Sequence, residues 1–427
     1  MTSATCTATD AHAAEGLLNR RKAIWVFLAF AAAYFLSALL RAITATLAPT
    51  LSEELALQAR DLGLLAGGYF LGFAATQLPL GRWLDRHGPK KVILVFLSVA
   101  VLGCAAFAWA ASFNGLLAAR VLIGAGVSAC LMAPLTGYRR WLAPAMQLRA
   151  NSWMLMTGSL GMVAATLPVQ WLMPHVGWRG LFWLLALGIV LCMLWLAWVV
   201  PAWLPRRSAS SATQTPGVGE APSGYAAVWR HPYFRKMTLI GFFNYGGMVA
   251  IQTLWAGPWL VRVTGQTPVE AATGLFWINL SMLCTFWTWG MVTPALAQRG
   301  VPVDRLIAWG LPLSMAMLAF NIFQGEATAW VHWALFCMLS TCASLSQPAV
   351  AMAFPSSMAG RALSAYNLVI FAGIFVVQWG IGLLVDGFEA LGWSELHAFR
   401  GAMAVFLGAC VLSYAVFLAV KAHNRGS

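Results

Sequence analysis

Arg41 lies within a hydrophobic stretch, FLSALLRAITATLAP, that runs from Phe35 to Pro49. A charged side chain in the interior of a membrane costs at least ~2.5 kcal/mol, so it normally faces a wet cavity or a partner. The chain has 13 aspartates and glutamates, and each falls in a tail, a loop or the end of a hydrophobic segment. A planar guanidinium can bind a carboxylate through two hydrogen bonds. The pattern therefore predicts that a substrate carboxylate supplies the partner that the chain itself lacks.

Other roles remain open for the two arginines of the apolar segments. Arg41 is nine residues from Thr50, roughly 13 Å along a helix, and an arginine near a helix end can extend its charge to the membrane surface. Arg120 opens the motif RVLIGAG, in which Gly124 and Gly126 allow tight helix packing. For Arg120 the pattern favours a structural role over ligand contact.

The composition is typical of a protein that crosses a membrane many times. Hydrophobic residues make up 60% and charged residues 9% of the 427, and the mean hydropathy is +0.75. Apolar runs of about 20 residues recur, each long enough to cross a bilayer as a helix that satisfies its own backbone. We predict an all-α membrane protein with twelve spans, at residues 23–48, 61–81, 91–111, 115–137, 150–173, 179–200, 236–262, 270–294, 304–323, 329–355, 362–385 and 398–420.

The net charge of +13 is distributed in a way that argues against nucleic-acid binding. With the N-terminus inside, 20 of the 26 lysines and arginines fall on the inner side, and only Arg60, Arg179, Arg262 and Arg400 fall in outer loops. This bias is the positive-inside signature. We expect a multi-pass protein of a bacterial inner membrane, surrounded by the lipid bilayer, with both termini in the cytoplasm.

A break in hydrophobicity divides the spans into six plus six. The segment PRRSASSATQTPGVGEAPSG is rich in Ser, Thr, Pro and Gly, as flexible linkers are. The halves echo each other weakly, because Pro49 and Pro258 have the same offset as Gly81 and Gly290. We predict a tail at 1–22, a six-helix bundle at 23–200, a linker at 201–235, a second six-helix bundle at 236–420 and a tail at 421–427. Two repeats about a site near the membrane midplane are typical of secondary transporters.

The loop GRWLDRHGPKK joins the second and third predicted spans. It resembles the cytoplasmic loop signature of the major facilitator superfamily, and RVLIGAG resembles that superfamily's fourth-span motif. The resemblance covers essentially the whole chain, and it implies two pseudo-symmetric bundles that transport by alternating access.

The same loop predicts a latch between the halves. Gly81 allows one helix end to approach another closely, and Asp85 can accept hydrogen bonds from a helix N-terminus or an arginine across the interface. Such a contact holds one access state and breaks in the other. The second half has no matching aspartate, so the latch is asymmetric. The predicted latch residues are Gly81, Asp85, Arg86 and Gly88; the alternative is a solvated loop that only sets topology.

The membrane arginines are most similar to those of the superfamily's organic-anion:cation symporters. Those proteins have an arginine in span one, about eight residues before a proline, and another in span four, and Arg41 and Arg120 match these positions. The resemblance implies a small organic anion as substrate and spans 1, 4, 7 and 10 around the cavity. The symporters also carry acids where this chain has Leu40 and Val127. A coupling proton or cation therefore stays open, together with uniport, exchange, and symport of a proton carried on the substrate.

Span seven, TLIGFFNYGGMVAIQTLWAGPWL, supplies the second half of the predicted site. Its polar and aromatic residues recur at helical spacing on one face, and its Gly-Gly and Gly-Pro pairs are points where a helix can bend or unwind. The position that matches Arg41 is Ala250, whereas the superfamily's organophosphate antiporters carry an arginine in each half, so the resemblance implies a carboxylate rather than a phosphate ester. We predict a substrate site made of Tyr34, Arg41, Arg120, Asn244, Gln252, Trp255, Asn279 and Gln347. Interhelical hydrogen bonds are the alternative role for the amides.

Three functions fit this pattern to different degrees. The first is transport of a small carboxylate, and the second is efflux of drug-like or amphiphilic solutes, which the aromatic content favours and the missing acids disfavour. The third is a receptor-like protein that moves nothing, against which the loop signature argues.

We expect a monomer that is not an enzyme and holds no cofactor, because no nucleophile–base pair or metal constellation is visible. A soft-metal route through Cys337, Met338 and Cys342 is only weakly indicated, because no other lining span carries a matching set.

Overall fold

The computed structural model describes residues 17–203 and 225–420, and all the regular structure among them is helical. The predicted tails lie mostly outside the described residues, as does much of the predicted linker. Before the linker the helices are α2 (Arg20–Leu55), α3 (Ala59–Trp109), α4 (Phe113–Val127), α5 (Ala129–Trp141), α6 (Pro144–Ala164) and α7 (Leu167–Val199).

After the linker the helices are shorter at first and then long. They are α8 (Tyr225–Arg230), α9 (Pro232–Leu239), η1 (Ile240–Tyr245), α10 (Gly246–Ala250), η2 (Ile251–Trp255), α11 (Ala256–Pro258), η3 (Trp259–Val263), α12 (Pro268–Gln298), α13 (Val303–Gln324), η4 (Gly325–Ala327), α14 (Trp330–Ser340), η5 (Thr341–Leu345), α15 (Ser346–Met352), α16 (Ser356–Ala390) and α17 (Glu395–Ala419). Helix α8 and the start of α9 fall inside the range predicted as linker, and the boundaries of the two bundles stay a prediction.

Helix is present at each of the twelve predicted spans within the described residues. Nine of the described helices are long and apolar enough to span a membrane. One of them, α3, contains two spans that meet at Gly88, where φ is +76°. Helix α6 and the interrupted helix from α9 to η3 supply the remaining two crossings. Several boundaries differ from the prediction, because the turn at Gly88 continues directly into helix on both sides and the fifth span breaks at Thr166 before it continues into α7.

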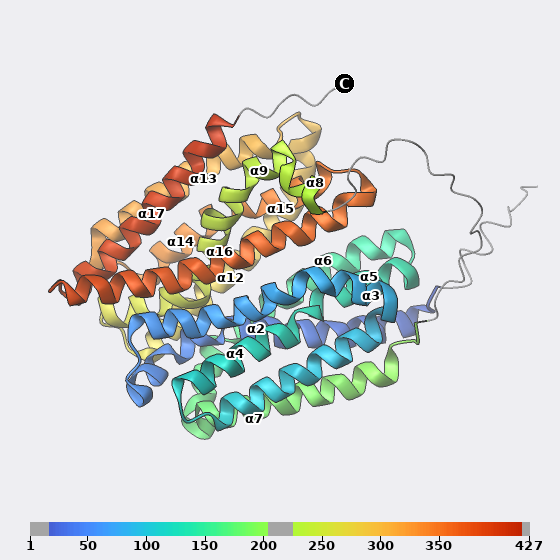
Figure 1. The fold of residues 1–427 in the computed structure, drawn as a ribbon, viewed down its shortest axis with the longest axis horizontal. Coiled ribbons are helices and arrows are strands. Elements are labelled where there is room, and N and C mark those ends of the chain that lie inside the picture. The colour runs from blue at the N-terminus through green and yellow to red at the C-terminus, as the bar shows by residue number, and fades with distance from the viewer. Residues whose placement is uncertain (1–16, 204–224, 421–427) are drawn as a thin grey trace, which may run out of the picture.

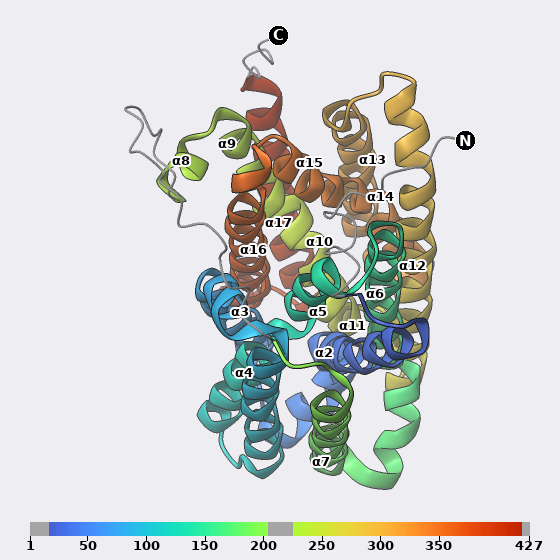
Figure 2. The same cartoon turned by 90° about the vertical axis from the view of Figure 1, so that its right-hand side faces the viewer.

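The helices form two groups, α2 to α7 and α8 to α17, which lie on opposite sides of the molecule in both views (Figures 1 and 2). Close packing within the first group depends on small residues. A Cβ on Gly124 would lie 1.9 Å from the carbonyl oxygen of Tyr69, and one on Gly126 would lie 2.3 Å from the amide nitrogen of Ala100. The predicted role of these glycines in tight helix packing is therefore confirmed.

Span seven is irregular, as its glycine and proline pairs predict. Three π-helical segments, η1, η2 and η3, interrupt the α-helix between Ile240 and Val263. Each wider turn changes the direction in which the following side chains point. The spacing of the polar residues along the sequence is therefore a poor guide to the face on which they lie.

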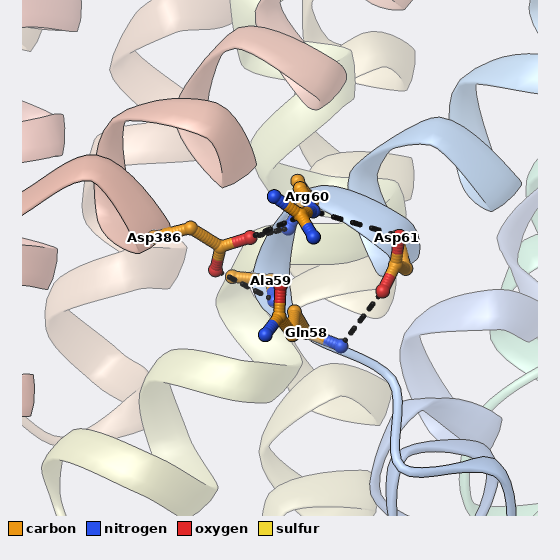
Figure 3. Close-up of polar contacts among 5 residues, drawn as sticks. All are labelled: Gln58, Ala59, Arg60, Asp61 and Asp386. Carbon is orange, nitrogen blue, oxygen red and sulfur yellow. Dashed lines mark hydrogen bonds and ion pairs between the residues drawn. The ribbon is translucent and has the colours of Figure 1, made fainter. Parts of the chain in front are cut away.

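The two groups are joined at one end by a carboxylate that bridges them. Asp386 of α16 accepts hydrogen bonds from the backbone N–H groups of Ala59 and Arg60, both at 3.0 Å, at the N-terminus of α3 (Figure 3). The Arg60 side chain lies 3.7 Å from the same carboxylate. Orphan N–H groups and the helix dipole both favour a negative charge at this position.

Glycines allow the backbones of α3 and α16 to touch at this end, which we call the Asp386 end. A Cβ on Gly63 would lie 2.3 Å from the carbonyl oxygen of Gln378, and one on Gly382 would lie 2.4 Å from that of Ala59. The ribbons of the two groups converge here and diverge toward the end that carries α5 and α8, which we call the linker end (Figure 1). A Cβ on Gly81 or Gly360, both near the linker end, would meet open space.

We predict that Asp386→Ala increases the population open at the Asp386 end, because the first N–H groups of α3 lose their acceptor. The loss of a helix cap costs about 0.5–2 kcal/mol, and 1 kcal/mol changes a population roughly fivefold. Distances between spin labels at Glu53 and Ala390, exposed positions of the two groups, measure the change by electron–electron double resonance.

The matched control is Asp61→Asn, which alters a neighbouring carboxylate that accepts a hydrogen bond from Gln58 within the same half. Asp61→Asn should leave the label distances unchanged. An unchanged distance distribution in Asp386→Ala would show that the Asp386 carboxylate does not hold the two groups of helices together at this end.

Candidate functional site

Arg41 is held by α2 in the interior of the molecule, where helices of both groups meet. Its side chain is half-buried, and its Nε is buried without a hydrogen-bond partner. Its polar neighbours are the tyrosines Tyr34, Tyr69 and Tyr245. Two of them come from the same half as Arg41, and Tyr245 comes from η1 in the other half. The guanidinium therefore lies at the junction of the two groups of helices rather than at a helix end.

An aromatic pair completes the surroundings of Arg41. The Arg41 Cζ lies 5.7 Å from the centroid of the Phe73 ring, within the range of a cation–π contact. Phe73 in turn contacts Phe371 of α16, with ring centroids 4.4 Å apart. The pair spans the two groups of helices, so the wall beside Arg41 is built by both halves.

No carboxylate of the described residues is paired with Arg41. The ion pairs between described residues join Arg60 to Asp61 and Asp386, Arg179 to Glu54, Lys236 to Asp304 and Arg262 to Glu395. All of these lie at helix ends. A guanidinium in this position is therefore stabilised by phenol groups and an aromatic face only, which leaves its positive charge available to an anion.

Arg120 differs from Arg41, because both of its terminal nitrogens are hydrogen-bonded to the protein, although its Nε, like that of Arg41, is buried without a partner. The side chain is 1% exposed, its Nη1 donates to the carbonyl oxygen of Leu40 at 3.0 Å, and its Nη2 donates to the hydroxyl of Thr44. The Tyr69 ring lies 5.4 Å from its Cζ. These contacts fasten span four to span one beside Arg41, and they correspond to the structural role that the RVLIGAG motif favours.

The polar residues of span seven point to three different helices of their own half. Asn244 donates to Ser413 of α17 at 2.5 Å, Gln252 donates to Asn279 of α12 at 2.8 Å, and the Trp255 indole donates to the carbonyl oxygen of Gln378 at 3.0 Å. The single face that the helical spacing predicts is therefore not present. The π-helical turns rotate these side chains apart, and each one is satisfied by an interhelical hydrogen bond.

Asn279 and Gln347 are also engaged by neighbouring side chains. Asn279 accepts from Gln252 and donates to the carbonyl oxygen of Leu275 at 2.8 Å. Gln347, half-buried on α15, donates to Asn367 of α16. In this conformation the amides make the interhelical contacts that were the alternative to substrate binding.

Tyr69, Phe73, Tyr245 and Phe371 belong to the surroundings of Arg41 but are absent from the predicted site. Nothing in their spacing distinguishes them from ordinary core aromatics. Tyr245 follows Asn244 directly, and the helical pattern assigned the cavity face to Asn244. The predicted residue and the residue that lies beside Arg41 are therefore adjacent in the chain. Only the π-helical turn of η1 decides which of the two faces Arg41.

The GRWLDRHG loop lies at the linker end. Asp85 and Arg86 are exposed, and neither makes a hydrogen bond or ion pair with another described residue. Gly88 adopts the positive φ of the turn, and Trp203 packs where a Cβ would be. The close helix approach predicted at Gly81 is absent here, because the two groups of helices diverge at this end.

The sulfur cluster of span ten is buried. Cys337 is 0% and Cys342 is 2% exposed. Within residues 17–203 and 225–420, no group of three or more His, Cys, Asp or Glu side chains is arranged to hold a metal ion.

Two groups of membrane-spanning helices that meet around a half-buried arginine are the arrangement of a polytopic membrane protein. The sequence profile described as "Major Facilitator Superfamily" matches residues 30–378, and the chain belongs to that superfamily. The chain is therefore a transporter by family and not an enzyme.

Similar proteins include carriers of organic acids. A gallate transporter of Pseudomonas putida is 30% identical over 406 residues, which cover 85% of this chain and 87% of the relative. A probable sulfoacetate transporter of Cupriavidus necator is 26% identical over 247 residues, 54% of this chain and only 56% of the relative's length. Among solved structures, a bacterial homologue of the human lysosomal transporter Spinster, inward-facing and unoccupied, has a TM-score of 0.76 at 18% identity, covering 94% of this chain and 98% of that one.

We predict that Thr44→Val destabilises the protein by ~1.5–3 kcal/mol, because the buried Arg120 guanidinium loses an acceptor without a change of shape. Thermal unfolding in detergent, followed by tryptophan fluorescence, measures this loss. The comparison variant is Arg41→Gln, which removes a charge that no described carboxylate pairs and should unfold at the same temperature or higher. An equal loss in Arg41→Gln would give Arg41 a structural role as well.

Proposed function

We propose that this chain transports a small organic anion bearing a carboxylate by alternating access, with Arg41 as the group that binds the anion. The observation that carries the proposal is the half-buried Arg41 guanidinium at the junction of the two halves, with a buried Nε that has no partner. An incoming carboxylate supplies the counter-charge through charge-assisted hydrogen bonds. Tyr34 and Tyr245 can donate their hydroxyls to the same anion, whereas the Tyr69 hydroxyl already donates to the carbonyl oxygen of Ser37 at 3.2 Å.

The names of the relatives agree with this substrate class. Gallate is a monoanion and sulfoacetate a dianion near neutral pH, so the two names agree on a small organic acid and not on its charge, and the gallate transporter is similar over most of its length. Because the similarity to the sulfoacetate transporter covers about half of that protein, it supports the class of cargo and does not identify the cargo of this chain.

The proposed setting is a bacterial inner membrane with the linker end in the cytoplasm, as the positive-inside bias indicates. In that orientation the Asp386 end is the outer end, and the contacts between α3 and α16 close it. The conformation then faces inward. We propose a monomer as the transporting unit and leave the driving ion to experiment, because no described carboxylate lies beside Arg41 to exchange a proton.

Efflux of drug-like solutes is the competing function. The aromatic surroundings of Arg41 favour it, since Phe73 and Phe371 offer apolar faces. The unpaired guanidinium disfavours it, because a neutral or cationic solute would leave the charge unsatisfied. A receptor-like protein that moves nothing is the third possibility, and net uptake of any substrate excludes it.

We predict that Arg41→Gln reduces carboxylate uptake into proteoliposomes at least about a hundredfold, because the anion loses its only counter-charge. A charge-assisted pair that is broken in a buried site costs ~3–5 kcal/mol. The measurement is uptake of radiolabelled gallate and of a panel of other labelled carboxylates.

Arg41→Lys retains the charge but not the planar fork, and it should keep a part of the activity. Thr44→Val, which alters the nearby Arg120 contact, is the control for indirect effects. Normal uptake by Arg41→Gln would exclude Arg41 as the anion site.

We predict that Asp85→Asn slows transport more than it weakens binding, because the proposed latch of Gly81, Asp85, Arg86 and Gly88 forms only when the linker end closes. Asp85 is exposed here, so the substitution should leave the unfolding temperature unchanged. Uptake rates and ligand-induced shifts of the unfolding temperature, measured on the same preparation, separate the two effects. Equal losses of binding and rate would contradict a latch.

A further inference from the structure

The number of free positive charges in the interior sets a limit on what the site can hold. Arg41 and Arg120 are the two arginines inside the apolar spans, and the structure assigns them different tasks. Arg120 is 1% exposed, and two of its nitrogens donate hydrogen bonds to the Leu40 carbonyl oxygen and the Thr44 hydroxyl. Each of the two has a buried Nε without a partner, but only Arg41 keeps exposed surface and has no hydrogen bond from its terminal nitrogens to a backbone carbonyl or a threonine.

The other half contributes no cation to this place. The described groups that face Arg41 from the opposite half are the Tyr245 phenol and, beyond Phe73, the Phe371 ring. The neutral amides of that half, such as Gln252, are bonded to each other. The charged residues nearest to the ends of span seven are tied to acids, Lys236 to Asp304 at 2.8 Å and Arg262 to Glu395 at 3.7 Å.

From these contacts we infer that the site accepts one negative charge: it selects monoanions, such as monocarboxylates, against dianions of similar shape. The inference rests on the proposed function, because it describes the charge of the cargo that Arg41 binds. The guanidinium neutralises one carboxylate. A second anionic group would be desolvated among phenols and phenylalanine rings with no counter-charge, and hydrogen bonds from tyrosine hydroxyls offset only part of that cost.

This selectivity for monoanions depends on whether the Arg120 side chain can reach the cavity. If Arg120 could turn toward the cavity, the site would hold two charges. Its hydrogen bond to the carbonyl oxygen of Leu40, the residue directly before Arg41, ties its guanidinium to the backbone of α2. Release would break both hydrogen bonds of a guanidinium that is only 1% exposed, so the protein retains Arg120 and the site retains one free charge.

The test compares probes that differ by one carboxylate on the same framework. Purified protein is titrated with benzoate and isophthalate, and with D-galactonate and galactarate, and binding is followed by the ligand-induced shift of the unfolding temperature. We expect each dianion that binds to be at least about tenfold weaker than its monoanionic partner. As the pH falls toward the second ionisation of isophthalate, its affinity should rise relative to that of benzoate, because isophthalate becomes a monoanion while benzoate loses its charge.

A second test of the single-charge inference changes the charge of the protein instead of the charge of the probe. Tyr245→Lys adds a cation from the opposite half and should narrow the difference between each dianion and its monoanion, whereas Tyr245→Phe should not. If monoanions and dianions bind equally and Arg41→Gln abolishes both, the single-charge inference is wrong and the proposed function stands. If no probe binds, or if binding survives Arg41→Gln, the carboxylate site itself is overturned.

Discussion

A positive charge in the interior of a membrane protein must find partners, and this chain meets the requirement in two different ways. Arg120 is satisfied by a backbone carbonyl and a hydroxyl of span one, so it acts as a fastener between helices. Arg41, one residue beyond that carbonyl, has phenols and an aromatic face but no carboxylate. The two side chains are coupled, because the bonds that Arg120 makes help to fix the turn of α2 from which Arg41 extends.

The charges that do form pairs lie at the ends of the helices, where water lowers the cost of making and breaking them. The Asp386 carboxylate at the N-terminus of α3 is such a contact, and it bridges the two halves. Nearer the centre the halves meet through apolar rings and glycines instead. This division suits a carrier, because polar contacts at the ends can be exchanged with water while the centre stays free of competing carboxylates.

The agreement between sequence and structure is good where a property depends on composition or on a single local requirement. Apolar length predicts the twelve crossings, since a bilayer demands helices of that length. Gly124 and Gly126 are found in the close packing expected of them. Span boundaries are less well predicted, because hydrophobicity does not distinguish a continuous helix from two helices that meet at a glycine such as Gly88.

The sequence alone determined that this is a polytopic helical membrane protein and that Arg41 is a charge without an acid in the spans, because both follow from residue types and their depth in apolar segments. Transport was implied by the resemblance of its loop and fourth-span motifs to those of the superfamily. Only the tertiary structure decided which arginine is free. The partners of Arg120 lie about eighty residues away in the chain, and no spacing rule reaches that far. The structure also places Tyr245 beside Arg41 and Asn244 against Ser413, and the π-helical turns of span seven shift side chains by amounts that helical periodicity cannot anticipate.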